Sequence, residues 1–364
     1  MFKFLTLTGY ISSLLLFHVV CVRGRDKSDV TRRLDIVKRQ NGDECAENSQ
    51  CISNCCSVFL FGDETCQTKK WWRTCRDGYH FRSDNQGQCL SGSSTNMVKL
   101  MSYNVYMIAL ASDITSMHER QGDLLTWFAE EGSEHDIIVI QENWINPEKI
   151  KNGLVAAGYC HYAIDDRGHS GSGLAVFSKY PIEEHDFRGF GNSCADFDCA
   201  IDKGVIYAKI IKDGNYMHVF GTHAISSVAN HDTRLEQFDV MHNFMNEKSI
   251  SSDYVFMMGD FNEDKIATPD KYDAMLNSLN AAEIQLVGSP YSYNPDENTL
   301  ISSGAIGSST GKHALDFIFY HNKQGLKYPS SDSECEYITP RNAAGKDLSD
   351  HYPIACTIVL LDEL

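Results

Sequence analysis

The hydrophobic pattern after residue 97 alternates short apolar runs with longer polar or amphipathic stretches. Eight runs have the length and composition of buried strands, namely residues 98–105, 136–141, 173–177, 204–211, 216–221, 254–259, 315–320 and 354–360. The Asp213-Gly214 pair separates two of these runs and predicts a tight hairpin turn. Since helix-length segments fit between the other runs and no internal repeat is visible, residues 98–364 are expected to form one α/β domain.

The clearest helical segment lies between the runs at residues 216–221 and 254–259. Glu236 follows Thr233 by three residues, and this capping-box spacing predicts a helix that starts at Thr233. Apolar residues then recur on one side of that helix, at Leu235, Phe238, Met241 and Met245. Their spacing indicates that this side packs against the rest of the domain.

The N-terminal residues have the features of a secretory address. In residues 1–22, Lys3 precedes an apolar run and small residues surround a cleavage point near Cys21, which predicts a signal peptide. Residues 23–39 are basic and poor in apolar residues, and they end at Lys38-Arg39. These features predict a propeptide that is cleaved before Gln40, and a disordered arm is an equally good interpretation. We therefore expect a secreted, extracellular protein. After residue 22 the sequence has no apolar stretch long enough for a membrane-spanning helix.

Cysteine usage supports the same compartment. Seven of the 13 cysteines fall between Cys45 and Cys89, at spacings that lack the paired C-x-x-C ligands of a zinc site. A segment this short cannot build a hydrophobic core, so residues 40–90 are expected to form a Cys-rich module held by disulfide bonds. The Ser/Gly-rich residues 91–97 are expected to form a linker. The opening ECAENSQCISNCC is similar to the start of cystine-knot and colipase-like modules.

The large domain contains five further cysteines, so both modules hold an odd number. Either one disulfide joins the modules or each module keeps a free thiol. Cys194 and Cys199 share one short loop, and Cys335 and Cys356 are suited to an end-strand pair. These two pairs leave Cys160 as the odd member of the large domain.

Residues able to do chemistry gather where the predicted strands end, as is usual when a rigid scaffold holds reactive groups. They are Asn104, Glu142, His223, Asp260, Asn262, Asp316, Asp350 and His351. Each alone has an ordinary explanation as a turn former, surface acid or core histidine, although a carboxylate inside an apolar strand, such as Asp316, needs a partner. Together they supply hard oxygen ligands for Mg²⁺, two histidines that titrate near neutral pH, and amide donors.

The order of the motifs SYNVYM, IQENW, GTHA, GDFNED, ALDFIFY and SDHYP resembles the endonuclease/exonuclease/phosphatase superfamily of Mg²⁺-dependent phosphoesterases. Within it, the chain is most similar to secreted neutral sphingomyelinases of the bacterial sphingomyelinase C type, which the runs ERQGDLL, GLAVFSKYPI and DKGVIYAKI also resemble. The resemblance covers residues 98–361. It implies a four-layer sandwich of two mixed β-sheets flanked by helices, and hydrolysis of sphingomyelin to ceramide and phosphocholine.

The resemblance also implies a role for each candidate residue. Glu142, with Asn104 and Asp350 near it, matches the family's Mg²⁺ site. Asp260 and Asn262 match the pair that positions the attacking water and a phosphate oxygen, and the same two residues are candidates for binding a second divalent ion.

The remaining matches concern proton transfer. His351 matches the general base, and Asp316 the carboxylate that orients it. His223 matches the histidine that hydrogen-bonds phosphate or assists the leaving group. An unperturbed histidine titrates near pH 6.5, so a neutral base is expected at neutral pH.

The chain departs from the bacterial pattern just before SDHYP. The resemblance implies an aromatic hairpin there that dips into the membrane, but residues 335–348 contain only one aromatic residue, Tyr337. Membrane contact is instead expected at Trp71 and Trp72, which follow two lysines, since indole and ammonium groups suit a lipid interface. The alternative is that these tryptophans fill the small core of the Cys-rich module.

Other functions remain open at this point. A deoxyribonuclease or an inositol-phosphate phosphatase could use the same scaffold, and a non-catalytic Cys-rich binding protein is a third alternative. The net charge of −17 and the scarcity of Lys and Arg near the motifs argue against polyanionic substrates, so no nucleic-acid partner is expected. The complete set of candidate catalytic residues argues against a non-catalytic protein.

Overall fold

The computed structural model describes residues 96–361 except 109–113, 166–170, 196–197, 200, 249–251 and 303–310, together with two short strands before residue 70. The chain divides into two compact units, residues 1–70 and 71–364, and each is described by itself. The predicted signal peptide and propeptide lie outside the described residues, and so do Trp71, Trp72 and residues 91–95 of the predicted linker. Met97, the last residue of that predicted linker, is already the first residue of a strand.

The first unit is described only in two strands. β1 (Cys56–Val58) pairs antiparallel with β2 (Glu64–Cys66), so that Cys56 lies opposite Cys66. The predicted disulfide framework of the Cys-rich module otherwise lies outside the described residues.

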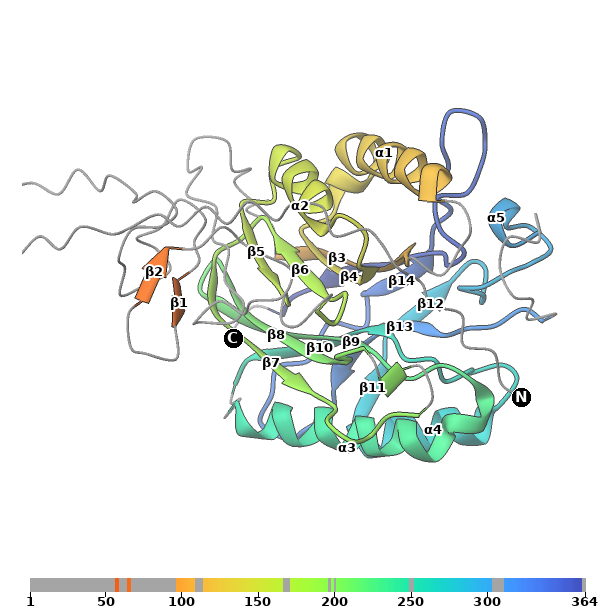
Figure 1. Cartoon of the computed structure of the whole chain (residues 1–364). Coiled ribbons are helices and arrows are strands. Elements are labelled where there is room, and N and C mark those ends of the chain that lie inside the picture. The colour runs from red at the N-terminus through yellow and green to blue at the C-terminus, as the bar shows by residue number, and fades with distance from the viewer. Residues whose placement is uncertain are drawn as a thin grey trace, which may run out of the picture. The chain divides into compact units, whose positions relative to one another are not determined.

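Two mixed β-sheets form the centre of the second unit (Figure 1). The six-stranded sheet has the order β11 (Ala281–Glu283), β13 (Asp316–His321), β10 (Tyr254–Asp260), β9 (Asn215–His223), β8 (Gly204–Lys212) and β7 (Ile182–Gly189). The seven-stranded sheet has the order β12 (Gln285–Val287), β14 (Glu334–Tyr337), β15 (Ile354–Val359), β3 (Met97–Met107), β4 (Ile137–Asn143), β6 (Ala175–Ser178) and β5 (His161–Ile164).

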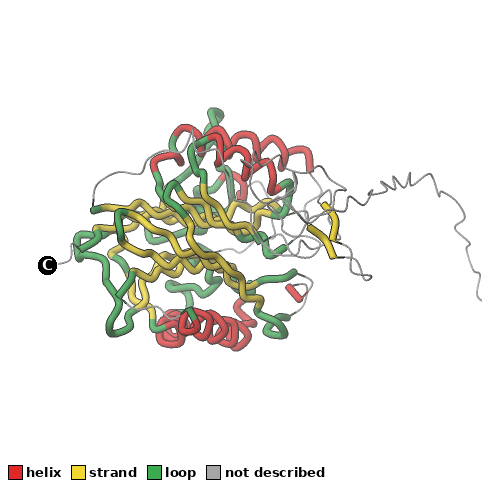
Figure 2. Tube along the Cα trace, turned by 90° about the vertical axis from the view of Figure 1, so that its left-hand side faces the viewer, coloured by secondary structure: helices red, strands yellow, loops and turns green. Residues whose placement is uncertain are grey.

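Helices cover the outer faces of both sheets, which gives the four layers that are visible in Figures 1 and 2. α1 (Ile114–Glu130) and α2 (Pro147–Ala156) pack on the seven-stranded sheet, and α3 (His231–Glu247) and α4 (Pro269–Leu279) on the six-stranded sheet. Short helical turns lie at η2 (Gly132–Glu134), η4 (Val228–Asn230) and α5 (Thr299–Ser302). The predicted four-layer α/β sandwich is therefore confirmed.

The strand β10 shows why its sequence is an uninterrupted apolar run. Phe256 and Met258 point into the core between the two sheets, whereas Val255 and Met257 pack in the layer that contains α3 and α4. All four side chains are buried because helices and the second sheet cover opposite faces of the strand.

Two glycines bring the strands close together next to the candidate site. A Cβ at Gly221 would lie 2.6 Å from the Val139 side chain of the facing sheet, and a Cβ at Gly259 would lie 2.1 Å from the Thr222 carbonyl oxygen. Only a hydrogen atom fits at these positions. The following candidate residues, His223 and Asp260, are thus held at a point of close approach.

All eight predicted strands are present, and their ends lie within two residues of the predicted ones. The predicted Asp213-Gly214 hairpin joins β8 to β9, and both turn residues have positive φ. The predicted start of α3 is wrong. The helix begins at His231, and Thr233 lies inside it, because the chain already turns through η4 into a helical conformation. On the predicted buried side, Phe238 and Met241 are buried and Leu235 is partly buried.

Both predicted local disulfides are present, between Cys194 and Cys199 and between Cys335 and Cys356. Cys160 is also disulfide-bonded, and the four cysteines just named are not available to it. Its partner therefore lies outside the residues whose side chains are described, as expected for the odd member of the large domain. None of the helices in the described part of the chain is long and apolar enough to cross a membrane.

Candidate functional site

Three candidate residues lie side by side on the six-stranded sheet because of strand register. Asp260 ends β10, His223 ends the parallel neighbour β9, and the two residues are partners in the register. Asp316 begins β13, which runs antiparallel to β10, and it is the partner of Asp260 on the other side. The sheet thus presents one histidine and two carboxylates in a row.

The facing sheet supplies the rest of the cluster. Asn104 lies in β3 and Glu142 in the adjacent parallel strand β4. The Asn104 side chain donates from Nδ2 to Glu142 Oε1 at 3.0 Å and to Asp260 Oδ2 at 3.1 Å. The second of these hydrogen bonds joins the two sheets. Asn104 Oδ1 accepts from the Tyr106 backbone N–H at 3.1 Å, so the amide orientation assigned here satisfies both ends.

The backbone is strained around this cluster. Three of the eight non-glycine residues with positive φ in the described chain are Tyr106, Glu142 and Asn262, at 49°, 57° and 51°. Such conformations cost free energy and persist where the surroundings fix them, often at functional sites.

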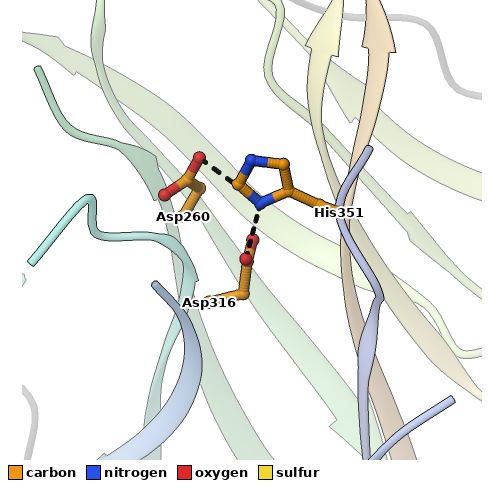
Figure 3. Close-up of side chains that lie close together, drawn as sticks. All are labelled: Asp260, Asp316 and His351. Carbon is orange, nitrogen blue, oxygen red and sulfur yellow. Dashed lines mark hydrogen bonds and ion pairs between the residues drawn. The ribbon is translucent and has the colours of Figure 1, made fainter. Parts of the chain in front are cut away.

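A buried histidine–carboxylate pair lies beside Asp260, as shown in Figure 3. His351 Nδ1 is 2.7 Å from Asp316 Oδ2 and 3.9 Å from Asp260 Oδ2. The Tyr337 hydroxyl donates to the Asp316 backbone carbonyl at 2.7 Å. Tyr337, the one aromatic residue of the segment before SDHYP, is therefore buried beneath the site rather than exposed for membrane contact.

Burial and neighbouring charges move the pKa values of this pair. Burial raises the pKa of Asp316 to about 6, even though His351 favours the carboxylate form. Burial alone would lower the pKa of His351, but the carboxylates of Asp316, Asp350 and Asp260 outweigh it and raise the pKa well above 6.5. The ordinary histidine pKa expected from the sequence therefore does not apply to the protein without a cation.

His223 is in the opposite electrostatic situation. Its Nε2 lies 3.6 Å from Asp260 Oδ2 and 3.8 Å from Glu142 Oε1. Burial lowers its pKa well below 6.5, and the nearby charges of Lys203 and His351 act in the same direction. His223 is therefore neutral. Its Nε2 accepts from the Lys203 ammonium, so the ring hydrogen is on Nδ1, which is buried and has no hydrogen-bond partner among the described residues.

Lys203 is a site residue that the sequence argument missed. Its ammonium lies 3.3 Å from His223 Nε2 and donates to Asp198 Oδ2 at 3.1 Å and to the Ala224 carbonyl at 3.0 Å. In the sequence, Lys203 could be recognised only as a lysine just before a predicted strand, in the run DKGVIYAKI. A lysine in that position is ordinarily exposed, whereas Lys203 is buried.

Arg120 and Ser349 are two further residues that the sequence argument missed. Arg120 donates to the carbonyls of Val105 and Leu348 at 2.8 and 2.7 Å, and so ties β3 to the segment that carries Asp350 and His351. Ser349 Oγ donates to the Asn104 carbonyl at 2.6 Å. These contacts place Asp350, which is itself buried, next to the Asn104–Glu142 pair.

Asn262 occupies the turn after β10. Its backbone N–H donates to Asp260 Oδ1 at 2.9 Å, and its Nδ2 donates to the Ala224 carbonyl at 3.1 Å. The side chain thus fixes the loops after β9 and β10 to each other. One of its two amide hydrogens remains for a ligand.

Part of the cluster has oxygen donors of the kind that bind a divalent cation. Glu142 Oε2 is buried and has no hydrogen-bond partner among the described residues. Burial, followed by the charge of Asp350, raises the pKa of Glu142 to about 7. An unpartnered buried carboxylate oxygen beside a second carboxylate fits a hard divalent cation. Asp260, Asp316 and His351 also have ligand atoms within 4.8 Å of one another, but His351 Nδ1 is already bonded to Asp316, so this trio fits a cation less well.

Comparison with known proteins gives the family. The sequence matches the Endonuclease/Exonuclease/phosphatase family over residues 101–351. The chain belongs to this family. It is therefore grouped with hydrolases of phosphate esters, as the motif order had indicated.

Individual relatives narrow the likeness. A protein named Phospholipase C from Staphylococcus aureus is 28% identical over 304 residues, which cover 75% of this chain and 90% of the relative. Sphingomyelinase C from Bacillus cereus is 25% identical over 307 residues, which cover 74% and 90%. These relatives agree with the resemblance noted in the sequence.

Solved structures confirm the fold. Beta toxin from Staphylococcus aureus has a TM-score of 0.60 at 26% identity and covers 71% of this chain and 99% of its own. A variant of that toxin with bound magnesium ions has the same TM-score and identity and covers 71% and 98%. The magnesium ions belong to that structure, and Mg²⁺ for the present chain is part of the proposal below.

Proposed function

We propose that the chain is a secreted sphingomyelin phosphodiesterase of the sphingomyelinase C type, which hydrolyses sphingomyelin to ceramide and phosphocholine. The observation that carries the proposal is the juxtaposition of the buried His351–Asp316 pair with the Glu142–Asn104–Asp260 cluster across two sheets. This arrangement provides a base and a cation site within one cluster, which hydrolysis of an anionic diester requires. The names and coverage of the relatives support the substrate class.

Glu142 and Asp350 are proposed to hold Mg²⁺. When bound there, the ion neutralises charge on the phosphoryl oxygens and the leaving oxygen. Asn104 orients the Glu142 carboxylate by its 3.0 Å hydrogen bond, and its Oδ1 keeps a second lone pair for the ion. Asp260 and Asn262 are further candidates for holding a second divalent ion.

His351 is proposed as the general base. Its Nδ1 is held by Asp316, which fixes the ring so that Nε2 accepts the proton from water. Asp316 then stabilises the imidazolium, as the carboxylate does in other His–carboxylate pairs. Asp260 and Asn262 position the water and a phosphoryl oxygen at the carboxyl end of β10.

His223 is proposed to bind the phosphate or the leaving oxygen. Burial, helped by the adjacent ammonium of Lys203, keeps His223 neutral, and this ammonium adds positive charge on the phosphate side of the cluster. Trp144 lies over His223 with ring centroids 6.1 Å apart and forms one wall beside it.

The charges near the site favour a zwitterionic lipid over a polyanion. Lys203 is paired with Asp198, and Arg120 is bonded to backbone carbonyls, so both nearby cations are already engaged. A polynucleotide or an inositol polyphosphate needs several cations of its own. A deoxyribonuclease or an inositol-phosphate phosphatase is thus only the second candidate. The substrate test described below separates these two activities from sphingomyelin hydrolysis.

The proposed membrane contact through Trp71 and Trp72 rests on the sequence alone. Replacing both with alanine should lower hydrolysis of sphingomyelin in vesicles several-fold and leave hydrolysis in detergent micelles nearly unchanged. Equal loss in both assays would show that the pair supports the fold of its own module.

The decisive experiment is a substrate and metal test. Purified protein is incubated separately with sphingomyelin, phosphatidylcholine, inositol polyphosphate and plasmid DNA, in chelator and after addition of Mg²⁺. We expect release of phosphocholine from sphingomyelin only with the metal. Full activity in chelator contradicts the proposed mechanism, and cleavage of DNA in place of lipid selects the second candidate.

A matched pair of variants tests the cation site. Glu142→Gln should keep the fold and lose most of the rate, because a neutral amide replaces the anionic ligand. Glu336→Gln, on the exposed side of β14, makes the same chemical change away from the site and should leave the rate unchanged. Isothermal titration with Mg²⁺ gives a readout independent of turnover, and heat of binding should disappear only in Glu142→Gln.

A further inference from the structure

Four large hydrophobic side chains are exposed in the described part of the chain, and they fall into two pairs. Val228 and Ile266 are 67% and 43% exposed, and Met97 and Leu361 are 40% and 53% exposed. Met97 begins β3, seven residues before Asn104, which places it about 23 Å away along the strand. Leu361 donates its backbone N–H to the Tyr254 hydroxyl at the start of β10, so this pair lies at the strand ends remote from the site.

Val228 and Ile266 lie at the other end of the strands. Val228 is in η4, five residues after His223 ends β9, and Ile266 follows Asp260, which ends β10, by six residues. Because β9 and β10 are parallel neighbours, both loops leave the sheet at the edge that carries the candidate site. The two exposed aliphatic side chains therefore belong to the rim of that site.

A buried ion pair holds the two loops together. Arg234 and Glu263 are both almost completely buried, and Arg234 Nε donates to Glu263 Oε2 at 2.9 Å. The same guanidinium donates to the Ser227 carbonyl at 2.6 Å, and Lys271 donates to the Val228 carbonyl at 3.3 Å. The loop with Val228 and the loop with Ile266 thus form one fixed platform, on which the apolar side chains stay exposed.

The platform carries little net charge although the whole chain has a charge of −17. Residues 226–229 are Ser-Ser-Val-Ala, all exposed and uncharged, and the exposed Ala267 follows Ile266. The charged residues that flank the two loops are two lysines, Lys265 and Lys271, and two aspartates, Asp232 and Asp270, so that their charges cancel. Such a surface suits a zwitterionic bilayer, which neither attracts nor repels net charge.

We propose that Val228 and Ile266 insert into the interface of a zwitterionic bilayer and hold the catalytic cluster over a lipid phosphodiester. The inference rests on the proposed function for its substrate. An enzyme in water gains affinity for an uncharged lipid surface by burying apolar side chains in it, roughly in proportion to the area buried. The rim placement brings the strand ends with His223 and Asp260 to the headgroup layer.

Vesicle binding tests the surface without turnover. The variant Val228→Ser with Ile266→Ser is compared with Met97→Ser with Leu361→Ser, which removes two other exposed apolar groups remote from the site. Sedimentation with phosphatidylcholine–sphingomyelin vesicles in chelator should show binding reduced about fivefold or more for the rim variant, on the area rule, and unchanged for the remote variant. Unchanged binding of the rim variant, or an equal loss in both variants, overturns the proposal.

Hydrolysis separates this proposal from the proposed function. The rim variant should lose most of its rate on sphingomyelin in vesicles and keep its rate on sphingomyelin in detergent micelles, because no catalytic group is changed. An equal loss in micelles would show that the loops shape the site, which contradicts a membrane role. If the unaltered protein cleaves sphingomyelin in neither form, the proposed function fails, whereas the sedimentation result still decides the binding surface.

Discussion

His218 and His351 are both buried and both bonded to a carboxylate, yet only one is suited to catalysis. His218, on β9, uses both ring nitrogens: Nδ1 lies 2.9 Å from the Tyr207 hydroxyl and Nε2 3.1 Å from Asp253 Oδ2. His351 uses Nδ1 for Asp316, and within the described residues its Nε2 has no hydrogen-bond partner. A histidine that is held at one nitrogen and open at the other can take a proton from water, whereas a fully bonded one can only brace the sheet.

The charges around the two histidines sharpen the contrast. Burial lowers the pKa of His218, although Asp253 opposes the shift. Around His351 three carboxylates overcome burial and raise the pKa. The fold therefore keeps one histidine neutral for structural hydrogen bonds and concentrates negative charge around the other, where a cation and an imidazolium can both be stabilised.

The largest effect is expected from His351→Ala. General-base catalysis contributes typically ~10²–10⁴-fold, so the turnover number on micellar sphingomyelin should fall by about that factor. The urea midpoint of unfolding should change little, because the carboxylates around the ring repel one another and can take up a proton when the ring is removed. Near-normal turnover at neutral pH would contradict the role given to His351.

A smaller loss is expected from Asp316→Asn, because the base remains and only its orientation and charge stabilisation suffer. Asp316 contributes to the raised pKa of His351, so its neutralisation should lower that pKa. The base must be neutral to act, and the acid limb of the pH–rate profile should therefore move to lower pH. A profile that stays in place would show that Asp316 does not interact electrostatically with the base.

The smallest effect on activity is expected from His218→Leu, which makes the same kind of change at the other histidine. Turnover should stay within about twofold, but the buried Tyr207 hydroxyl loses its partner, at a cost of about 1–3 kcal/mol in unfolding free energy. Urea unfolding measures the loss. If this variant lost turnover as His351→Ala does, the distinction between the two histidines would fail.

The same variant carries a pH prediction. The pKa of His218 is lower in the folded protein than the ordinary 6.5, so the unfolded chain binds the proton more tightly. This contribution to stability is complete above pH 6.5 and is lost as the pH falls below that value. The unfolding free energy of the unaltered protein should therefore decrease more steeply between pH 7 and pH 5 than that of His218→Leu.

The strands that sequence could predict are those buried on both faces. β4 contains the uninterrupted apolar run 137–140 and β10 the run 254–258, so any scheme based on hydrophobic runs finds them. β7 was missed because it lies at the sheet edge with mostly half-exposed polar residues, IEEHDFRG. The short strands β5 and β12 also lie at sheet edges, where pairing with one neighbour rather than an apolar pattern defines the strand.

The candidate site could be predicted as a set of residues but not as a geometry. The row of His223, Asp260 and Asp316 follows from strand register, which the sequence does not contain. Lys203 was missed because only the fold shows that a lysine before a strand is turned inward to His223. The raised pKa of His351 likewise depends on three carboxylates from distant segments that meet in space.

The position of β15 has a consequence for how the protein comes into being. It is the last strand of the domain in sequence, yet it lies inside the seven-stranded sheet between β14 and β3, and Asp350 and His351 immediately precede it. Contacts between such distant segments form late and slowly. During synthesis on a ribosome the sheet stays divided, and the proposed cation ligand Asp350 and the proposed base His351 are absent from the cluster, until this final segment emerges. We therefore expect the nascent chain to be inert toward phosphodiesters and to gain the proposed activity only when the two ends of the domain meet.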